Sequence, residues 1–291
     1  MDIIEVFKRF TDKSACISYL EKVRWNNKPC CPYCGSTNYS DMKGEHRYHC
    51  NNCNTSFSVT VGTIFHNTKL PLQKWFLAVS LVINAKKGIA ARQLARDIHV
   101  TKDTAWRILM QIRKAMFEYG DLLQGIIEAD ETFIGGKNKN RHNDDKTKGG
   151  QGRSAKDKQP VFGVLERDGK VSARTVEDTK KTTLQKIIME KVKHGSTIMT
   201  DEWLGYNGLS RKYVHKVIKH NEGKYVDGDI YTNTLEGFWS LFKRGFVGQY
   251  HQLSKRYLNR YLDEFCFRYN NRDNERMFEM ILSKGVCLIY E

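Results

Sequence analysis

Two closely spaced cysteine pairs, Cys31-x2-Cys34 and Cys50-x2-Cys53, constrain the fold of this chain more than any other feature. Each C-x-x-C segment fits a tight turn that directs two thiolates at one ion, and two such turns complete a closed tetrahedral site. A closed site leaves no coordination position for a substrate, so we expect a structural Zn²⁺. The sequence therefore predicts a four-cysteine zinc ribbon near the N-terminus.

Residues near these pairs leave open which side chains bind the metal and whether the cysteines are redox-active. Cys30 adjoins the first pair, but the spacing favours Cys31 as the ligand. A redox-active C-x-x-C is the other interpretation, and two pairs at this spacing make it the weaker one. We expect His46, His49 and His66 to take no part in metal binding.

The charge balance predicts a polyanionic partner. The chain has 48 Lys and Arg against 33 Asp and Glu, a formal net charge of +15. Such an excess favours nucleic acid, because counterions are released when cations neutralise phosphates. No stretch approaches the ~18 uninterrupted apolar residues of a membrane span, and the first residues lack a signal-peptide layout. We therefore expect a cytoplasmic, nucleoid-associated protein that binds double-stranded DNA and no membrane.

Residues 91–116 have the periodicity of a helix-turn-helix. Apolar residues at helical spacing would bury one side of each helix, and Thr101 would cap the second helix. Lys102, Arg107 and Arg113 are then expected to be exposed and to contact DNA. A plain helical hairpin is the alternative; the neighbouring zinc ribbon and the basic charge favour DNA contact.

The second half of the chain has a mixed α/β pattern, with strands first and helices after. The expected elements are a helix over 1–28 in the first half, then a strand over 125–134, a hairpin turning at Asp168-Gly169, a helix over 179–193, short strands at 197–201 and 213–219, and helices from about 232. The lysine- and arginine-rich stretch 137–159 has almost nothing apolar and predicts a solvated loop. Whether that loop touches DNA stays open.

Three acids lie in separate predicted elements: Asp130 in the strand over 125–134, Asp201 at the end of an apolar stretch, and Glu236 in a helical segment. Phosphodiester chemistry uses carboxylates because Mg²⁺ prefers hard oxygen ligands, and two ions about 4 Å apart serve both the attacking and the leaving oxygen. Taken alone, each acid is more often ordinary surface charge.

The segments DETFIGGK, TDEWLGY, TNTLEGFWSLFKRG and GQYHQLSKRYLNRYLDEFCFRYNNR resemble bacterial insertion-sequence transposases. Within these the chain is most similar, from about residue 10 to 278, to the family called fifteen-ninety-five, in which a zinc ribbon precedes an ISXO-two-like Asp-Asp-Glu (DDE) domain. The resemblance implies a ribonuclease-H-like catalytic domain that cleaves and joins DNA with two Mg²⁺ or Mn²⁺ ions. It also implies binding to the element's terminal inverted repeats and to target DNA, and we expect a homodimer or higher oligomer on DNA.

Carried over by position, the resemblance makes Asp130, Asp201 and Glu236 the catalytic, metal-binding acids. Lys243 follows Glu236 by about two helical turns, shares its face and would reach a phosphate beside the metals. Three further cations of the last helices are candidates for phosphate contacts: Arg244, Lys255 and Arg256.

Neighbouring polar residues admit other roles. In a regular strand Glu131 points away from Asp130 and Glu128 points to the same side. We expect Glu128 to be solvated, with an assisting role as the alternative. Glu202 is interpreted as a bystander, and Asn233 as a helix cap rather than a site residue.

The predicted architecture is therefore multidomain: an N-terminal helix with the zinc ribbon over 1–66, a helix-turn-helix DNA-binding segment over 67–120, and an α/β ribonuclease-H-like domain, a mixed sheet with helices, over 121–291. Two other functions stay open. One is a catalytically inactive zinc-ribbon DNA-binding regulator, which the presence of all three acids counts against. The other is a ribonuclease-H-like structure-specific nuclease, which the DNA-reading first half counts against.

Overall fold

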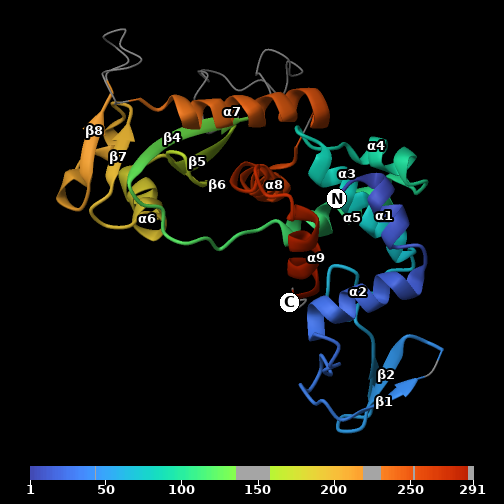
Figure 1. The fold of residues 1–291 in the computed structure, drawn as a ribbon. Helices are drawn as coiled ribbons and strands as arrows, with labels where there is room; N and C mark the ends of the chain where they lie inside the picture. Colours follow the sequence, from blue (N-terminus) through green and yellow to red (C-terminus); the bar gives the residue numbers. More distant parts are fainter. Residues whose placement is uncertain (43, 136–157, 219–230, 252, 288–291) are drawn as a thin grey trace, which may run out of the picture. The chain divides into compact units, whose positions relative to one another are not determined.

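The computed structural model describes residues 1–42, 44–135, 158–218, 231–251 and 253–287, and the chain divides into two compact units (Figure 1). The first unit consists of Met1–Phe117 with Asp273–Glu291, and the second of Glu118–Arg272. The C-terminal segment thus clusters with the N-terminal part of the chain, whereas the sequence assigned it to the domain over 121–291. The functional division into three domains stays a prediction.

The first unit contains helices that pack around a cluster of aromatic rings. The centre of the Phe10 ring lies 4.6 Å from that of Phe76 and 6.1 Å from that of Phe278. Where the sequence predicted one helix over 1–28, the structure has two, because Asp12 accepts the Ala15 N–H at 2.8 Å and starts a new helix. The helices are α1 (Ile3–Arg9), α2 (Lys13–Trp25), α3 (Leu72–Asn84), α4 (Ala91–Asp97), α5 (Lys102–Ala115) and α9 (Met277–Cys287).

Helix α9 joins the first unit through a close approach at Gly285. The Ile64 N–H donates to the Gly285 carbonyl at 3.0 Å. A Cβ at position 285 would lie 2.7 Å from the Ile64 side chain, closer than real Cβ contacts allow. The contact spans most of the chain, which explains why no local sequence pattern predicted it.

The two helices of the predicted helix-turn-helix are α4 and α5. Thr101 caps α5, as predicted, by accepting the Thr104 N–H at 3.2 Å. Lys102 and Arg107 are exposed, as predicted. The predicted exposure of Arg113 is wrong: its side chain is buried, because it follows buried Leu109 by one helical turn on the packed face of α5.

The second unit contains a five-stranded mixed sheet with strand order β6-β5-β4-β7-β8. Strands β4, β5 and β6 pair antiparallel, whereas β4, β7 and β8 pair parallel. The strands are β4 (Ile126–Ile134), β5 (Gln159–Glu166), β6 (Val171–Thr175), β7 (Thr197–Thr200) and β8 (Val214–Val217). The β5–β6 hairpin turns at Asp168, which has a φ of 57°, so the predicted hairpin and the mixed sheet are confirmed.

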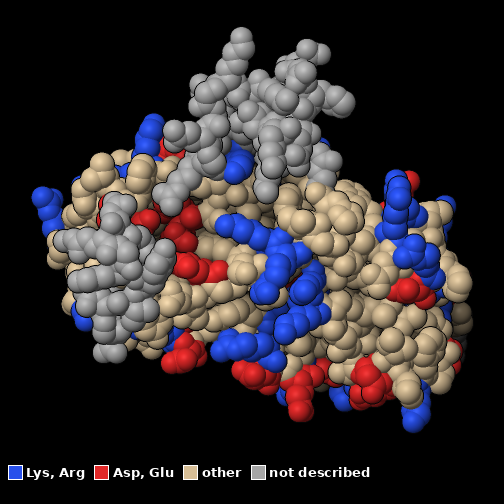
Figure 2. Space-filling view, turned by 90° about the horizontal axis from the view of Figure 1, so that it is seen from above, with Lys and Arg blue, Asp and Glu red and all other residues tan. Residues whose placement is uncertain are grey.

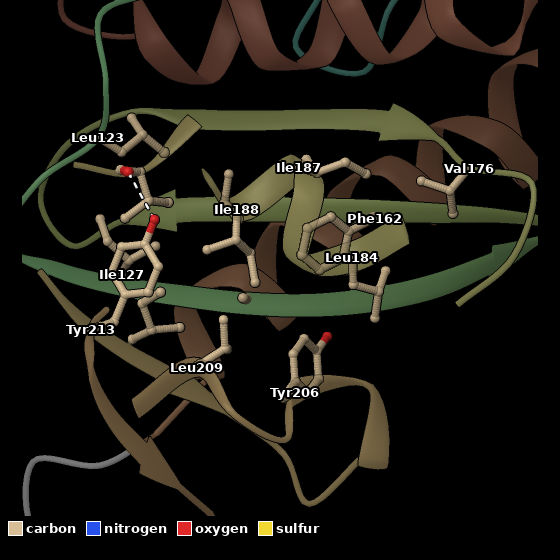
Figure 3. Close-up of a cluster of buried hydrophobic side chains, with 14 residues drawn as sticks. Leu123, Ile127, Phe162, Val176, Leu184, Ile187, Ile188, Tyr206, Leu209 and Tyr213 are labelled. Atoms are coloured by element: carbon tan, nitrogen blue, oxygen red, sulfur yellow. Dashed lines mark hydrogen bonds between the residues drawn. The ribbon is translucent and has the colours of Figure 1, made fainter. Parts of the chain in front are cut away.

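Alternation along β4 sends its side chains to two different environments. Ile127 and Ala129 join a buried apolar cluster with residues of α6 (Lys181–Lys191), seen in Figure 3. Glu128 and Asp130 face the opposite side, where α7 (Asn233–Gly245) lies against β4 and β5. Helix α8 (Leu258–Asn270) packs on β6. Within the described segments, no helix has the length and apolar character needed to span a membrane.

Candidate active site and zinc ribbon

The strand order brings the segments of the first two acids together. In the parallel pairing of β4 with β7, Glu128 lies opposite Met199. Asp130 follows Glu128 by two residues on β4, and Asp201 is the residue directly after β7, which ends at Thr200. The two-residue repeat of a strand places the Asp130 side chain on the same face as Glu128, the face that α7 covers. Asp201 also accepts the Trp203 N–H at 3.0 Å, which orients its carboxylate.

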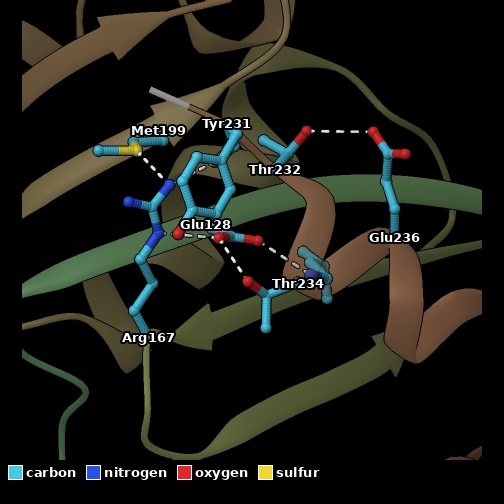
Figure 4. A network of polar contacts seen from close by, with 8 residues as sticks. Glu128, Arg167, Met199, Tyr231, Thr232, Thr234 and Glu236 are labelled. Carbon is cyan, nitrogen blue, oxygen red and sulfur yellow. Dashed lines mark hydrogen bonds and ion pairs between the residues drawn. The ribbon is translucent and has the colours of Figure 1, made fainter. Parts of the chain in front are cut away.

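Helix α7 brings the third acid to this face. Glu236 lies in its first turn, where its carboxylate accepts the Thr232 hydroxyl at 3.2 Å (Figure 4). The close approach of the helix depends on Gly163, which pairs with Asp130 across β4 and β5. A Cβ at position 163 would lie 2.6 Å from the Trp239 ring on α7. No local sequence pattern singles out Gly163, because its role depends on a helix distant in the chain.

The acids influence one another electrostatically. Burial raises the pKa of Asp130 to about 7, and the charges of Glu131, Asp201 and Glu236 raise it in the same direction. A carboxyl with a pKa this high is unfavourable as an anion unless a cation joins it. Asp201 and Glu236 therefore lie close enough to Asp130 for their charges to act on it, and the role of the three acids as one metal site stays a prediction.

Lys243 lies within electrostatic reach of the same site. Partial burial lowers its pKa, an effect that the charges of Asp130 and Glu236 oppose. Glu131 points away from Asp130, as predicted, and accepts the buried Tyr206 hydroxyl at 2.6 Å. The Glu131 carboxylate thus lies on the α6 side of the sheet, although its charge still raises the pKa of Asp130.

Two predictions about neighbouring polar residues are wrong. Glu128 is not solvated: its carboxylate is fully buried and accepts the Leu235 N–H at 2.9 Å. Asn233 does not cap α7, because the helix begins after Thr232 and neither supplies a side-chain cap. The Glu128 carboxylate, which reaches across from β4, satisfies the free N–H instead.

The four predicted cysteine ligands converge in the first unit. Strands β1 (Tyr39–Met42), β2 (Arg47–Cys50) and β3 (Thr55–Phe57) form an antiparallel sheet beside them. The sulfur atoms lie within 4.8 Å of one another, with Cys31–Cys53 at 3.7 Å and Cys34–Cys50 at 3.5 Å. This spacing and donor set fit a tetrahedral Zn²⁺.

Two further observations concern metal binding. Among these thiols, which hydrogen-bond to one another, the pKa of Cys50 is lowered, chiefly by the backbone N–H of Cys53, whereas the pKa of Cys34 is raised. Cys30 instead directs its thiol to the Gly35 carbonyl at 3.3 Å. Among the described residues, no group of three acids gathers its ligand atoms as closely as the cysteines do.

Basic and acidic side chains gather on one face of the molecule. Figure 2, a view from above, shows acidic side chains next to a band of lysines and arginines. The predicted DNA-binding cations Arg244, Lys255 and Arg256 are exposed, and their role stays a prediction. The loop over 137–159 falls almost entirely outside the described residues.

The raised pKa of Asp130 predicts a pH-dependent gain in stability on removal of its charge. The folded protein keeps the Asp130 proton up to about pH 7, whereas the unfolded chain loses it near the ordinary pKa of an aspartate. Between these two values the free energy of unfolding falls as the pH rises, because the folded state binds more protons than the unfolded state. Asp130→Asn should therefore raise the melting temperature of the metal-free protein at pH 8 by about 2–4 °C, which corresponds to ~1 kcal/mol after allowance for solvent screening.

The gain from Asp130→Asn should shrink as the pH falls below about 7 and approach zero only near pH 4, the ordinary pKa of an aspartate. Calorimetry at pH 8 and pH 4 measures it, with the exposed Asp121→Asn as control. An equal gain at both pH values, or none at pH 8, would contradict the electrostatic account of this site.

Comparisons with known proteins agree on one family. The sequence profile of the ISXO2-like transposase domain matches residues 122–270, and that of the transposase zinc-ribbon domain matches residues 11–56. A protein in transposable element ISH50 of Halobacterium salinarum is 29% identical over 90% of this chain and 92% of its own length. A transposase-like protein of Haemophilus influenzae is 30% identical over 40% of this chain and 95% of its own length.

Among solved structures, the Mos1 transposase paired-end complex with left transposon end is 14% identical and covers 72% of this chain and 78% of that one. Its TM-score is 0.31. The two domain profiles together define a transposase with a zinc ribbon. The chain therefore belongs to the family of transposases with an ISXO2-like transposase domain, as the resemblance indicated.

Proposed function

We propose that this chain is an active DDE transposase that binds the terminal inverted repeats of its element, cleaves at their ends and joins the freed strand to target DNA. The observation that carries the proposal is the placement of Asp130, Asp201 and Glu236, which come from β4, the end of β7 and α7 yet interact electrostatically. In a transposase family, such a convergence of acids from distant segments supports phosphodiester chemistry.

The donor set fits hard divalent cations, and Asp130, Asp201 and Glu236 would hold them. Two Mg²⁺ or Mn²⁺ ions, when bound, supply an activated oxygen nucleophile and neutralise the leaving oxygen. Lys243, on the same helix as Glu236, would hold a phosphate of the DNA backbone next to the acids. The ribonuclease-H-like domain in this proposal is the mixed sheet with its helices.

The chain's own residues supply the remaining functions. The zinc ribbon and the segment α4–α5 would select the element's ends, and Arg244, Lys255 and Arg256 would hold the DNA backbone. We also propose that the protein acts as a homodimer or higher oligomer, because two element ends must be processed together.

The DNA-reading role is tested by the double substitution Lys102→Ala with Arg107→Ala, both exposed on α5. We expect the protein to lose its preference for element ends. The slope of the logarithm of the binding constant against the logarithm of the salt concentration should also become shallower, by about one for each phosphate that the protein no longer neutralises. Fluorescence anisotropy with end and unrelated duplexes, measured over a range of salt concentrations, provides both values.

Substitution suits this test better than truncation, because α9 packs with the N-terminal helices. The matched control is Lys8→Ala, an exposed lysine on α1. If the double variant selects element ends as well as the unaltered protein does, α5 does not read the DNA.

A further inference from the structure

Arg167, in the turn between β5 and β6, contacts three separate segments of the second unit (Figure 4). Its Nε donates to the Glu128 carboxylate at 2.9 Å, and its Nη2 donates to the Tyr231 carbonyl at 2.8 Å. The same Nη2 lies 3.0 Å from the Met199 sulfur. The guanidinium also stacks on the Tyr231 ring, 3.5 Å from its centroid. One planar group thus links three parts of the chain.

These three segments are the ones that carry the acids. Glu128 lies two residues before Asp130 on β4, and Met199, on β7, lies two residues before Asp201, which directly follows that strand. The third contact, at Tyr231, holds the chain just ahead of α7 and its Glu236. A shift of any one segment relative to the others would have to break a contact with the guanidinium.

Glu128 extends this linkage to the start of α7. Besides Arg167, its buried carboxylate accepts the Thr234 hydroxyl at 2.9 Å and the Leu235 N–H at 2.9 Å. A negative charge at a helix N-terminus is favourable, because it meets the unsatisfied N–H groups and the positive end of the helix dipole. The strand of Asp130 and the helix of Glu236 are thereby fixed to each other.

Stability alone does not account for this arrangement. The side chains of Arg167 and Glu128 are 12% and 0% exposed. A buried ion pair is often no more stabilising than apolar residues of similar volume, because both charges lose their hydration. What the pair provides is a defined geometry, since a guanidinium presents several donors in a fixed plane.

We propose that Arg167 and Glu128 are positioning residues that set the relative placement of Asp130, Asp201 and Glu236, so that the acids are arranged for divalent ions before the ions bind. The inference rests on the proposed function of these acids. Neither residue is proposed to touch the DNA or the ions.

The first test is Arg167→Lys, which keeps the charge but replaces the planar group by a single flexible donor. Loss of a residue that orients metal ligands typically weakens metal affinity 10–100-fold. We therefore expect the Mg²⁺ concentration for half-maximal DNA cleavage to rise by about tenfold, with DNA binding unchanged. The matched control is Arg174→Lys, whose partner Glu190 lies at the same 2.9 Å in an exposed pair.

A second readout uses the metal-free protein. Hydrogen exchange, measured by mass spectrometry on peptides covering 232–240, should show faster exchange in Arg167→Lys and normal exchange in Arg174→Lys, because the Leu235 N–H loses its fixed acceptor. Unchanged exchange at α7, or a Mg²⁺ requirement within twofold of the unaltered protein, would overturn the proposal.

Substitution of both residues separates positioning from stability. Arg167→Gln leaves a buried, unpaired Glu128 charge and should lower the melting temperature strongly. Adding Glu128→Gln should restore much of the melting temperature, because no charge then remains buried, but the raised Mg²⁺ requirement should persist. Recovery of both properties together would show that the pair is merely structural. If the unaltered protein does not cleave DNA at all, the proposed function fails, whereas the exchange measurement still decides whether Arg167 orders α7.

Discussion

Asp130→Asn, Asp201→Asn and Glu236→Gln should each reduce DNA cleavage and strand joining by about a thousandfold while keeping fold and DNA binding. Each substitution removes one of the three proposed metal ligands, and the charges of Asp201 and Glu236 both act on Asp130. Metal ions contribute several kcal/mol of transition-state stabilisation, and each 1.4 kcal/mol corresponds to a factor of about ten in rate. Gel analysis of a labelled element end measures both reactions.

The matched control for the acid substitutions is Glu202→Gln, next to Asp201 in the chain. It should be nearly silent, because Glu202 has no proposed role in the site. Lys243→Ala should act more mildly than the acid substitutions, by weakening the hold on a phosphate. A Glu236→Gln protein that joins DNA ends at the normal rate would refute the assignment of the third acid.

Cys50→Ser should release the zinc and unfold the ribbon. The protein should carry one Zn²⁺ per chain, since the four sulfur atoms lie within 4.8 Å of one another. Binding to structural sites of this kind contributes about 10–16 kcal/mol and is coupled to folding. Elemental analysis gives the zinc content, and hydrogen exchange of β1–β3 reports the loss of structure.

Cys30→Ser is a close control for the zinc experiment, because Cys30 adjoins a ligand but directs its thiol to a carbonyl. It should retain the zinc. Full zinc content in Cys50→Ser, or zinc loss in Cys30→Ser, would show that the ligand set differs from Cys31, Cys34, Cys50 and Cys53.

Local spacing explains why some features of this protein could be predicted from its sequence. The cysteine ligands are set by two tight turns, and the convergence in space was confirmed. The β5–β6 hairpin was predicted from the turn at Asp168-Gly169 within the segment VFGVLERDGKVSARTVE. The α5 cap at Thr101 followed from its position before a periodic segment.

Long-range contacts explain the failures. Glu128 has the local appearance of a solvated acid, and only Arg167 and the start of α7, both distant in the chain, provide its buried partners. Arg113 has the charge of a surface residue, although its spacing from Leu109 places it on the buried face. The packing of α9 with the first unit depends on a contact at Gly285 that no local pattern indicates.

The acid site was only partly accessible to sequence reasoning. Motifs made Asp130, Asp201 and Glu236 the candidate acids, which stays a prediction. No pattern indicated that Gly163 must lack a side chain so that Trp239 and its helix can approach the sheet. Nor did the sequence single out Arg167. Such residues act through geometry, which appears only when strand register and helix packing are known.

Whether this chain cuts and joins DNA at one metal-dependent site is measured by incubating the unaltered protein with a labelled element end, a target plasmid and Mn²⁺, with Asp130→Asn in parallel. We expect both nicked and joined products from the unaltered protein, neither without the metal, and neither from Asp130→Asn. Nicked products without joining would indicate a nuclease, and DNA binding without any strand breakage would indicate a regulator; either result would refute the proposed transposase activity.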